Sequence, residues 1–227
     1  YQKFCRRRDK TPETVFSWED VPAIPTDAFK NSQLSLFPEH LRCTFMTSGT
    51  SNPDEKGVVT YDSGGLALMD ATIRVAAGAF LFPDKRKPRL LILAPPPEAA
   101  PHMIMVYGMN RLIDYFGRSD SRFLVGPKGF DPEELIHALE HGEKEDIPVA
   151  LCGGSFGFVN FFDYCDKRGR TFQLPEGSRC LDAGGFKGRS REINREEFLE
   201  QCETYLGVKS PWCVNLLGMT ETASQFY

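Results

Sequence analysis

The sequence lacks the cysteine spacing of a zinc knuckle or of a disulfide framework. No Cys-x-x-Cys pair occurs, and the number of cysteines is odd. The seven are Cys5, Cys43, Cys152, Cys165, Cys180, Cys202 and Cys213. Most of them stand in apolar runs such as VALCGG and PWCVNLL, where cysteine behaves as a small buried hydrophobe. We therefore expect reduced thiols that pack in the core.

A strong charge of either sign is missing as well. The net charge of -4 over 227 residues provides no basic footprint for nucleic acid or for an anionic membrane surface. The basic cluster of Arg6, Arg7, Arg8 and Lys10 is expected to be solvated. No stretch is apolar enough to span a bilayer, and no signal peptide is recognised. We expect a cytoplasmic protein with no membrane span and no nucleic-acid partner.

Short apolar runs alternate with amphipathic segments along most of the chain. Strands are predicted at 88–96, 121–126, 147–154, 178–185 and 211–218, of which 88–96 is expected to be buried on both faces. Helices are predicted at 64–82, 99–117, 131–144, 155–169 and 195–207. Strands and helices that alternate at this spacing predict an α/β fold with a mostly parallel sheet flanked by helices. The proline-rich residues 1–40 predict an irregular lead-in packed on the domain, and residues 41–227 predict a nucleotide-binding core.

Three polar clusters are predicted to follow strands, where parallel α/β sheets collect their ligands. The first is the turn of TFMTSGTSNPDEKGVVTYD, between apolar runs predicted to pair as a hairpin. Its small residues would let backbone N–H groups approach phosphate oxygens, and its lysine adds a point charge. It is not a Walker A loop, because no Gly-Lys-Ser/Thr occurs. An ordinary hairpin turn is the alternative. The other clusters are LDAGGFKG and NLLGMTETASQ.

Thr220 and Glu221 place a hydroxyl and a carboxylate directly after a predicted strand and Gly218. A carboxylate that faces a phosphate site can supply one hard oxygen ligand to Mg²⁺. The alternative is a helix N-terminus, which Thr220 would cap and where Glu221 would favour the dipole.

The motifs TSGTS…KG and NLLGMTE, in this order and separation, resemble two core motifs of the acyl-adenylate-forming superfamily. More closely, IPTDAFK, LPEGSRCLDAGGFKG, SREINREEF and NLLGMTETASQFY resemble the acyl-protein synthetases of bacterial bioluminescence. The likeness covers nearly the whole chain. It implies activation of a carboxylic acid, of the long-chain fatty type, by MgATP to an acyl-adenylate, followed by transfer to a protein cysteine as a thioester. Acyl-reductase and acyl-transferase subunits are the partners implied, and the fold implied is part of the large N-terminal domain of these enzymes.

Matched position by position, the resemblance assigns the nucleotide site. The β- and γ-phosphates would be held by Thr47, Ser48, Gly49, Thr50, Ser51 and Lys56. Thr220 would contact the α-phosphate, Glu221 would bind Mg²⁺, and Gly218 would belong to the same nucleotide-binding segment. Gly184 and Gly185 would form a backbone wall against adenine. Lys56, Thr220 and Glu221 would be the catalytic residues.

His102 falls where the superfamily often has an aromatic residue or a histidine beside the acyl carboxylate, and a histidine packed on a helix is the alternative. His137 and His141, one turn apart, are interpreted as exposed helix residues, because no third metal ligand accompanies them. Lys187 either touches nucleotide or faces solvent.

The sequence also departs from the pattern. The phosphate turn is one residue longer than usual, and Leu217 replaces the tyrosine that usually stacks on adenine. The ribose-binding aspartate, the catalytic lysine of the mobile C-terminal domain and the acyl-accepting cysteine have no counterpart here, so we expect that domain to be absent from this chain. Two other functions stay open: an acyl-CoA ligase of the phenylacetate-CoA ligase type, and a non-catalytic nucleotide-binding relic.

Overall fold

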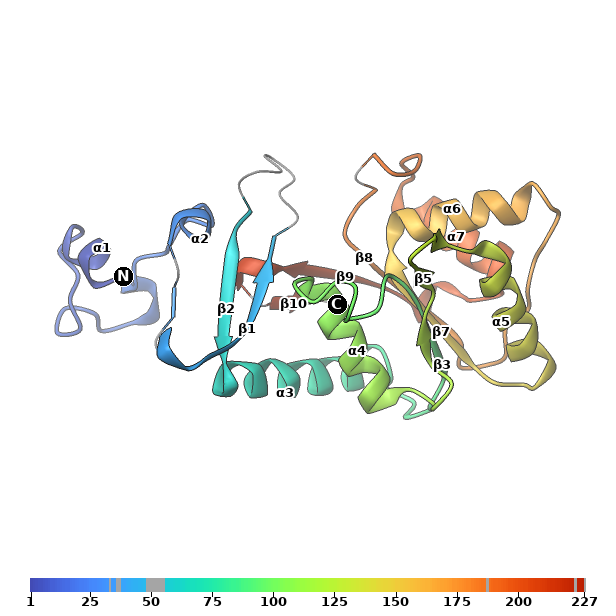
Figure 1. Cartoon of the computed structure of the whole chain (residues 1–227), viewed down its shortest axis with the longest axis horizontal. Coiled ribbons are helices and arrows are strands. Elements are labelled where there is room, and N and C mark those ends of the chain that lie inside the picture. Colours follow the sequence, from blue (N-terminus) through green and yellow to red (C-terminus); the bar gives the residue numbers. More distant parts are fainter. Residues whose placement is uncertain (33, 36–37, 48–55, 187, 223, 227) are drawn as a thin grey trace. The chain divides into compact units, whose positions relative to one another are not determined.

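The computed structural model describes all 227 residues except 33, 36–37, 48–55, 187, 223 and 227. The chain forms two compact units, residues 1–66 and 67–227, and Figure 1 shows their helices and strands. Among the helices of the described part, none combines the length and the apolar composition needed to cross a membrane.

The first unit contains a β-hairpin preceded by short helical segments. The strands β1 (Leu41–Met46) and β2 (Val58–Asp62) pair antiparallel, as the sequence predicts. Phe45 packs edge-on against Tyr61, with ring centroids 5.7 Å apart. The helical segments are α1 (Gln2–Arg6), α2 (Ala28–Asn31) and the 3-10 turns Trp18–Asp20 and Pro38–His40.

The second unit is built on a six-stranded sheet with the order β10-β9-β8-β7-β3-β4. The strands are β3 (Arg89–Leu93), β4 (Arg122–Phe123), β7 (Val149–Gly154), β8 (Arg179–Ala183), β9 (Cys213–Met219) and β10 (Ser224–Phe226). The first five of these are parallel to one another, and only β10 runs antiparallel to its neighbour. The prediction of an α/β fold with a mostly parallel sheet is confirmed.

Helices cover both faces of this sheet, because right-handed crossovers that run in opposite directions along a sheet lie on opposite sides. The helices are α3 (Ser63–Phe80), α4 (Ile104–Phe116), α5 (Pro132–Lys144), α6 (Ser155–Asp166) and α7 (Arg195–Leu206). The connection from β3 to β4 contains α4, whereas α5, α6 and α7 connect strands in the other direction along the sheet. The Tyr107 hydroxyl donates to Asp70, which joins α4 to α3.

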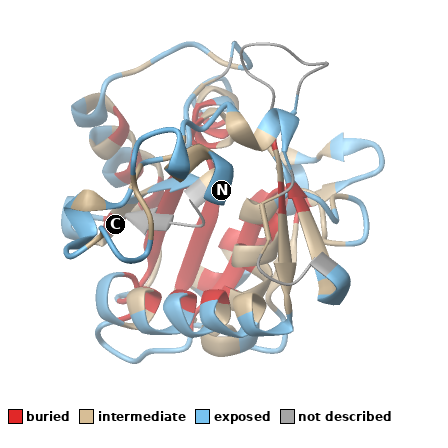
Figure 2. Ribbon diagram, turned by 90° about the vertical axis from the view of Figure 1, so that its left-hand side faces the viewer, coloured by how far each residue is buried: buried red, intermediate tan, exposed pale blue. Residues whose placement is uncertain are grey.

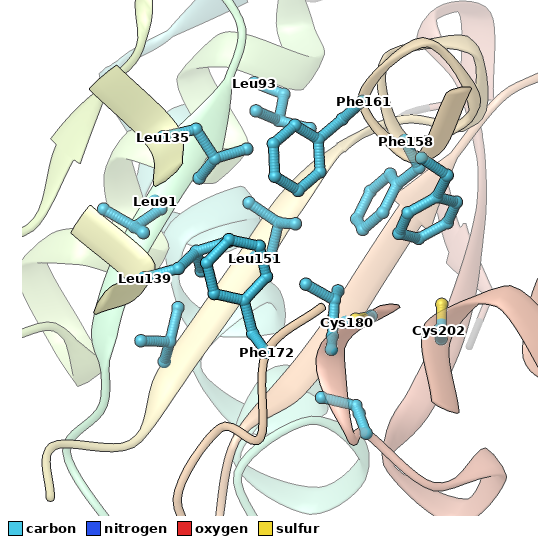
Figure 3. Close-up of a cluster of buried hydrophobic side chains, with 14 of the residues drawn as sticks. Leu91, Leu93, Leu135, Leu139, Leu151, Phe158, Phe161, Phe172, Cys180 and Cys202 are labelled. Carbon is cyan, nitrogen blue, oxygen red and sulfur yellow. The ribbon is translucent and has the colours of Figure 1, made fainter. Parts of the chain in front are cut away.

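The central strands β3, β7 and β8 are buried along their whole length, as the red strands in Figure 2 show. Leu91, Leu151 and Cys180 belong to a core cluster that also contains phenylalanines and leucines of α5, α6 and α7. Figure 3 shows these side chains packed between strand and helix ribbons. This core fixes the strands whose ends carry the candidate site.

Local sequence signals place two of the helix starts. Asp131 accepts from the Glu133 N–H at 3.0 Å and precedes Pro132, the first residue of α5. Asn194 accepts from the Glu197 N–H at 2.8 Å and caps α7. Both caps were predicted, because each needs only residues within one turn.

Two segments differ from their predicted boundaries. The predicted strand at 121–126 divides: β4 joins the sheet, while β5 (Val125–Gly126) forms a separate hairpin with β6 (Gly129–Phe130). The predicted helix at 99–117 begins only at Ile104, after a turn at Pro101 and His102. Pro101 has no N–H to donate in a helix, so the helix starts beyond it.

Candidate functional site

Two of the predicted polar segments lie at one edge of the sheet, at the carboxyl ends of neighbouring strands. Cα pairs in parallel register join β8 to β9 from Cys180 and Cys213 to Ala183 and Leu216. Gly184 and Gly185 follow β8, and Thr220 and Glu221 follow β9. The fold therefore brings these two predicted segments together, at the edge where parallel sheets bind ligands.

The turn after β8 exposes bare backbone. Gly184 has a φ of +74°, in the left-handed region that favours glycine, and both Gly184 and Gly185 are exposed. A Cβ built at either position meets no heavy atom within 4 Å. A flat ligand can therefore approach this backbone closely, as the adenine wall implied by the resemblance requires.

A buried polar network holds this turn in place. Asp182, a buried residue of β8, accepts from Arg195 Nη1 at 2.7 Å, from Asn215 Nδ2 at 2.8 Å and from Ser155 Oγ at 3.0 Å. Ser155 Oγ also lies 3.0 Å from the Gly184 carbonyl oxygen. Arg195 Nη2 donates a further hydrogen bond, of 2.7 Å, to the Cys213 carbonyl oxygen. The Asp182 carboxylate thus connects β8 to β9, α6 and α7, two residues before Gly184.

This network was not predicted from the sequence. The only sequence signal for the network is Asp182, an aspartate in the mostly apolar end of the run RCLDAGG. A buried carboxylate has to find hydrogen-bond partners. The partners come from α6, α7 and β9, and no local pattern identifies them.

Thr220 and Glu221 occupy a single 3-10 turn, Thr220–Thr222, between β9 and the antiparallel β10. Both residues are half-buried. The alternative in which they start a helix is wrong, because the chain returns as a strand and Ser224 pairs with Met219. Neither residue therefore has a helix dipole of any length to stabilise.

Relative to the register of β8, β9 runs on for about three residues, from Leu217 to Met219, before it reaches Thr220. At the usual rise per residue this overhang is roughly 10 Å. Leu217 is exposed on it, at the position where the resemblance would place an aromatic ring. The exposed glycines and the Thr220 turn are thus two separate contact points along one edge.

The predicted phosphate turn belongs to the first unit and connects β1 to β2. It does not follow a strand of the parallel sheet, so that part of the prediction is wrong. Its base is closed by two hydrogen bonds: the Thr47 N–H donates to the Gly57 carbonyl oxygen at 2.9 Å, and Thr47 Oγ1 accepts from the Gly57 N–H at 2.8 Å. Lys56 is exposed. Ser48, Gly49, Thr50 and Ser51 lie outside the described residues.

His102 lies in the turn between β3 and α4 and is exposed. The alternative of a histidine packed on a helix is therefore wrong, while its contact with an acyl carboxylate stays a prediction. His137 and His141 are exposed on α5 as expected, facing Glu140 at 3.6 Å and Glu145 at 3.0 Å. Lys187 lies outside the described residues.

Five of the seven free cysteines are buried: Cys152, Cys165, Cys180, Cys202 and Cys213. Burial raises the pKa of Cys152 to about 12 and the pKa of Cys165 to about 11, so neither thiol is a ready nucleophile. Cys213 differs, because its interactions with the neighbouring thiols of Cys180 and Cys202 lower its pKa below the usual value. Its sulfur is nevertheless buried, and the expectation of thiols packed in the core is confirmed for these five.

The residues at the sheet edge fit a nucleotide. Backbone without side chains at Gly184 and Gly185 suits a planar base, and the Thr220 hydroxyl suits a phosphate oxygen. Glu221 supplies one carboxylate, which is as much as Mg²⁺ commonly takes from a protein when phosphates provide further ligands.

The family model described as "Acyl-protein synthetase, LuxE" matches residues 1–225. No curated protein matches the chain.

Proposed function

The chain belongs to the LuxE acyl-protein synthetase family, and from this premise we propose that it activates a long-chain fatty acid with ATP and passes the acyl group to a protein cysteine. Membership of the family implies acyl-protein synthetase activity, which is that of an ATP-dependent ligase. The identity of the acid, the acyl-adenylate intermediate and the role of Mg²⁺ are our proposals.

The proposed reaction has two steps. A carboxylate oxygen of the acid attacks the α-phosphorus of ATP; the bond to the β-phosphate oxygen breaks, and pyrophosphate leaves. A thiol sulfur then attacks the acyl carbon of the acyl-adenylate, AMP leaves, and the thiol proton passes to solvent. The first attacking group is already an anion, so no general base is needed. Stabilisation of charge on the phosphate oxygens is the main task of the protein.

The observation that carries the proposal is the meeting of two segments at the ends of β8 and β9. Gly184 and Gly185 would receive the adenine against exposed backbone. About three residues further along, the Thr220 hydroxyl would donate to the α-phosphate. A ligand with a flat base and a phosphate chain can reach from the two glycines to Thr220. The carboxylic acid would approach the same phosphate.

Glu221 would hold Mg²⁺ next to Thr220. The metal would neutralise phosphate charge, and Glu221 contributes one oxygen ligand from the turn between β9 and β10. Lys56 is exposed in the first unit, next to the closing pair Thr47–Gly57, and its role toward the β- and γ-phosphates stays a prediction.

Burial of thiols bears on the acceptor. An acyl-adenylate has to meet a nucleophilic sulfur, and the sulfurs of Cys152, Cys165, Cys180, Cys202 and Cys213 are buried. We therefore propose that the acceptor is a cysteine outside this set of residues. Acyl-reductase and acyl-transferase subunits are the proposed partners, and a reducing cytoplasm is the compartment in which free thiols persist.

ATP–pyrophosphate exchange tests the proposal. The purified full-length protein should incorporate labelled pyrophosphate into ATP only when a fatty acid is present, with a Glu221→Gln variant as the inactive control. No carboxylate-dependent exchange would favour the nucleotide-binding relic. Formation of acyl-CoA on addition of CoA would favour a ligase of the phenylacetate type.

A further inference from the structure

Three cysteines that are far apart in the sequence meet in the core of the second unit. Cys180 lies in β8, Cys202 in α7 and Cys213 at the start of β9. Their Sγ atoms all lie within 4.8 Å of one another, and all three residues are buried. In Figure 3, Cys180 and Cys202 stand together at one side of the hydrophobic cluster.

The crossover β8–α7–β9 produces this meeting. Cys180 and Cys213 are direct partners in the parallel register, so their side chains project from the same face of the sheet. That face is covered by α7, where Cys202 shares the buried stripe with Phe198 and Leu206, one turn away on either side. Each of the three connected elements thus contributes one sulfur to a single point.

We propose that Cys180, Cys202 and Cys213 form a binding site for one soft metal ion, of which Zn²⁺ is the representative. Three thiolates are the ligand set that soft and borderline ions prefer over hard ones. An ion at the centre of a triangle whose edges are at most 4.8 Å would lie at most about 2.8 Å from each sulfur. Zinc–sulfur bonds are about 2.3 Å long, so each sulfur has to move inward by at most about half an ångström, and a water molecule would take the fourth position of a tetrahedral site.

The charge of a filled site follows from its ligands. Binding of a divalent ion releases the thiol protons and leaves three thiolates with one excess negative charge. The guanidinium of Arg195 is fixed beside the site by its hydrogen bond of 2.7 Å to the Cys213 carbonyl oxygen. It supplies a nearby positive charge, which its ion pair of 2.7 Å with Asp182 partly offsets. A filled-shell ion such as Zn²⁺ imposes no geometry through its d electrons, so it accepts the arrangement that the fold offers.

A metal ion bound to the three cysteines would cross-link α7 to β8 and β9. These are the two strands whose ends carry Gly184 and Glu221, but the site itself lies in the core cluster and not at that edge. The inference therefore does not depend on the proposed adenylation, and it can fail or hold independently.

The test uses the full chain, reduced, unfolded in denaturant and refolded with or without Cd²⁺, because a closed site has to be filled as the core forms. We expect one Cd²⁺ per chain after desalting, with the ultraviolet charge-transfer absorption of cadmium thiolates. Because cadmium is softer than zinc, Cd²⁺ added to the zinc-loaded protein should displace the zinc and produce the same absorption. Refolded protein without bound metal, with all thiols free or with a disulfide among the three cysteines, would overturn the proposal.

Single substitutions locate the site. Cys202→Ala should weaken Cd²⁺ binding by about 100-fold or more, since loss of a ligand exceeds the effect of losing a group outside the ligand shell. Cys152→Ala is the matched control, because Cys152 is equally buried in β7 and is not part of the cluster. Equal binding by both variants would exclude the site.

A measurement on the unmodified protein covers the case in which Cys202→Ala does not fold. X-ray absorption of the zinc-loaded chain should give three sulfur neighbours at about 2.3 Å. A shell of nitrogen and oxygen neighbours would contradict the assignment without any variant.

Discussion

Ser155, the first residue of α6, donates a hydrogen bond of 3.0 Å toward the carbonyl oxygen of Gly184 in the turn after β8. The same hydroxyl lies 3.0 Å from Asp182, so its one proton is shared between two acceptors. This contact ties the exposed glycine turn to a helix on one face of the sheet. It connects the stability of the core to the shape of the proposed nucleotide site.

Replacement of Ser155 by alanine should loosen the glycine turn. Loss of one buried hydrogen bond corresponds to about 1 kcal/mol, so we expect the KM for ATP in pyrophosphate exchange to rise about five-fold. Ser178→Ala is the matched control: this buried serine accepts from the Val149 N–H at 3.0 Å, at the opposite end of β7. Both variants should lose similar thermal stability. A similar rise in KM for both would show that Ser155 acts only through stability.

Substitution Glu221→Gln tests the metal ligand. The amide is nearly isosteric but lacks the charge that attracts Mg²⁺, so we expect adenylation to fall by about 100-fold. The thermal midpoint should stay unchanged, because the turn Thr220–Thr222 offers no long helix whose dipole Glu221 could stabilise. Glu200→Gln, on the exposed face of α7, is the control and should keep full activity. An active Glu221→Gln enzyme would refute the metal role.

The ion pair of Arg179 and Asp84 should set part of the acid stability. Arg179 is fully buried and donates to both Asp84 oxygens, at 3.1 and 2.7 Å. Burial by itself raises the pKa of Asp84, but the hydrogen bonds and charge of Arg179 outweigh burial and hold the pKa below its ordinary value of 3.8. A carboxylate with a lowered folded pKa stabilises the fold above its unfolded pKa, and this contribution is lost as the pH falls through the folded pKa.

We therefore expect Asp84→Asn to lower the free energy of unfolding by about 3 kcal/mol at neutral pH, since it leaves a buried guanidinium without its counter-charge. The loss should shrink in denaturant titrations carried out below about pH 4. Asp114→Asn breaks a partly exposed pair with Arg111 at 2.7 Å and should cost less than about 1 kcal/mol. A pH-independent difference between Asp84→Asn and the parent protein would contradict this account.

None of the seven cysteines should carry the acyl group. Five are buried in the second unit, and the two others, Cys5 and Cys43, are half-buried in the first unit. After incubation with labelled fatty acid and ATP, peptide mapping under conditions that preserve thioesters should find no label on any of them. A labelled peptide that contains one of these cysteines would disprove the prediction.

The order of strands and helices in the second unit could be predicted from the sequence, because the signals are local. A run such as RLLIL is apolar at every position, which is typical of a strand buried on both faces. Caps such as Asp131 and Asn194 need only the residues of the next turn. The divided strand around Leu124 could not be predicted, because its apolar pattern continues while its hydrogen-bonding partners change.

The candidate site was predicted in part for the same reason. Recognisable runs after apolar segments contain Gly184, Gly185, Thr220 and Glu221, so these candidates could be named from the sequence alone. The same runs indicated the family. Tertiary structure alone decided that β10 returns beside β9, which removes the helix after Glu221. It also decided that Asp182 meets Ser155 and Arg195.

The three cysteines show the limit most plainly. In the sequence, Cys180, Cys202 and Cys213 are isolated residues in apolar runs, and their spacing matches no metal motif. Whether they meet depends on the register of β8 against β9 and on the face that α7 turns toward the sheet. Register and helix rotation are set by the packing of the whole core, which no short stretch of sequence encodes.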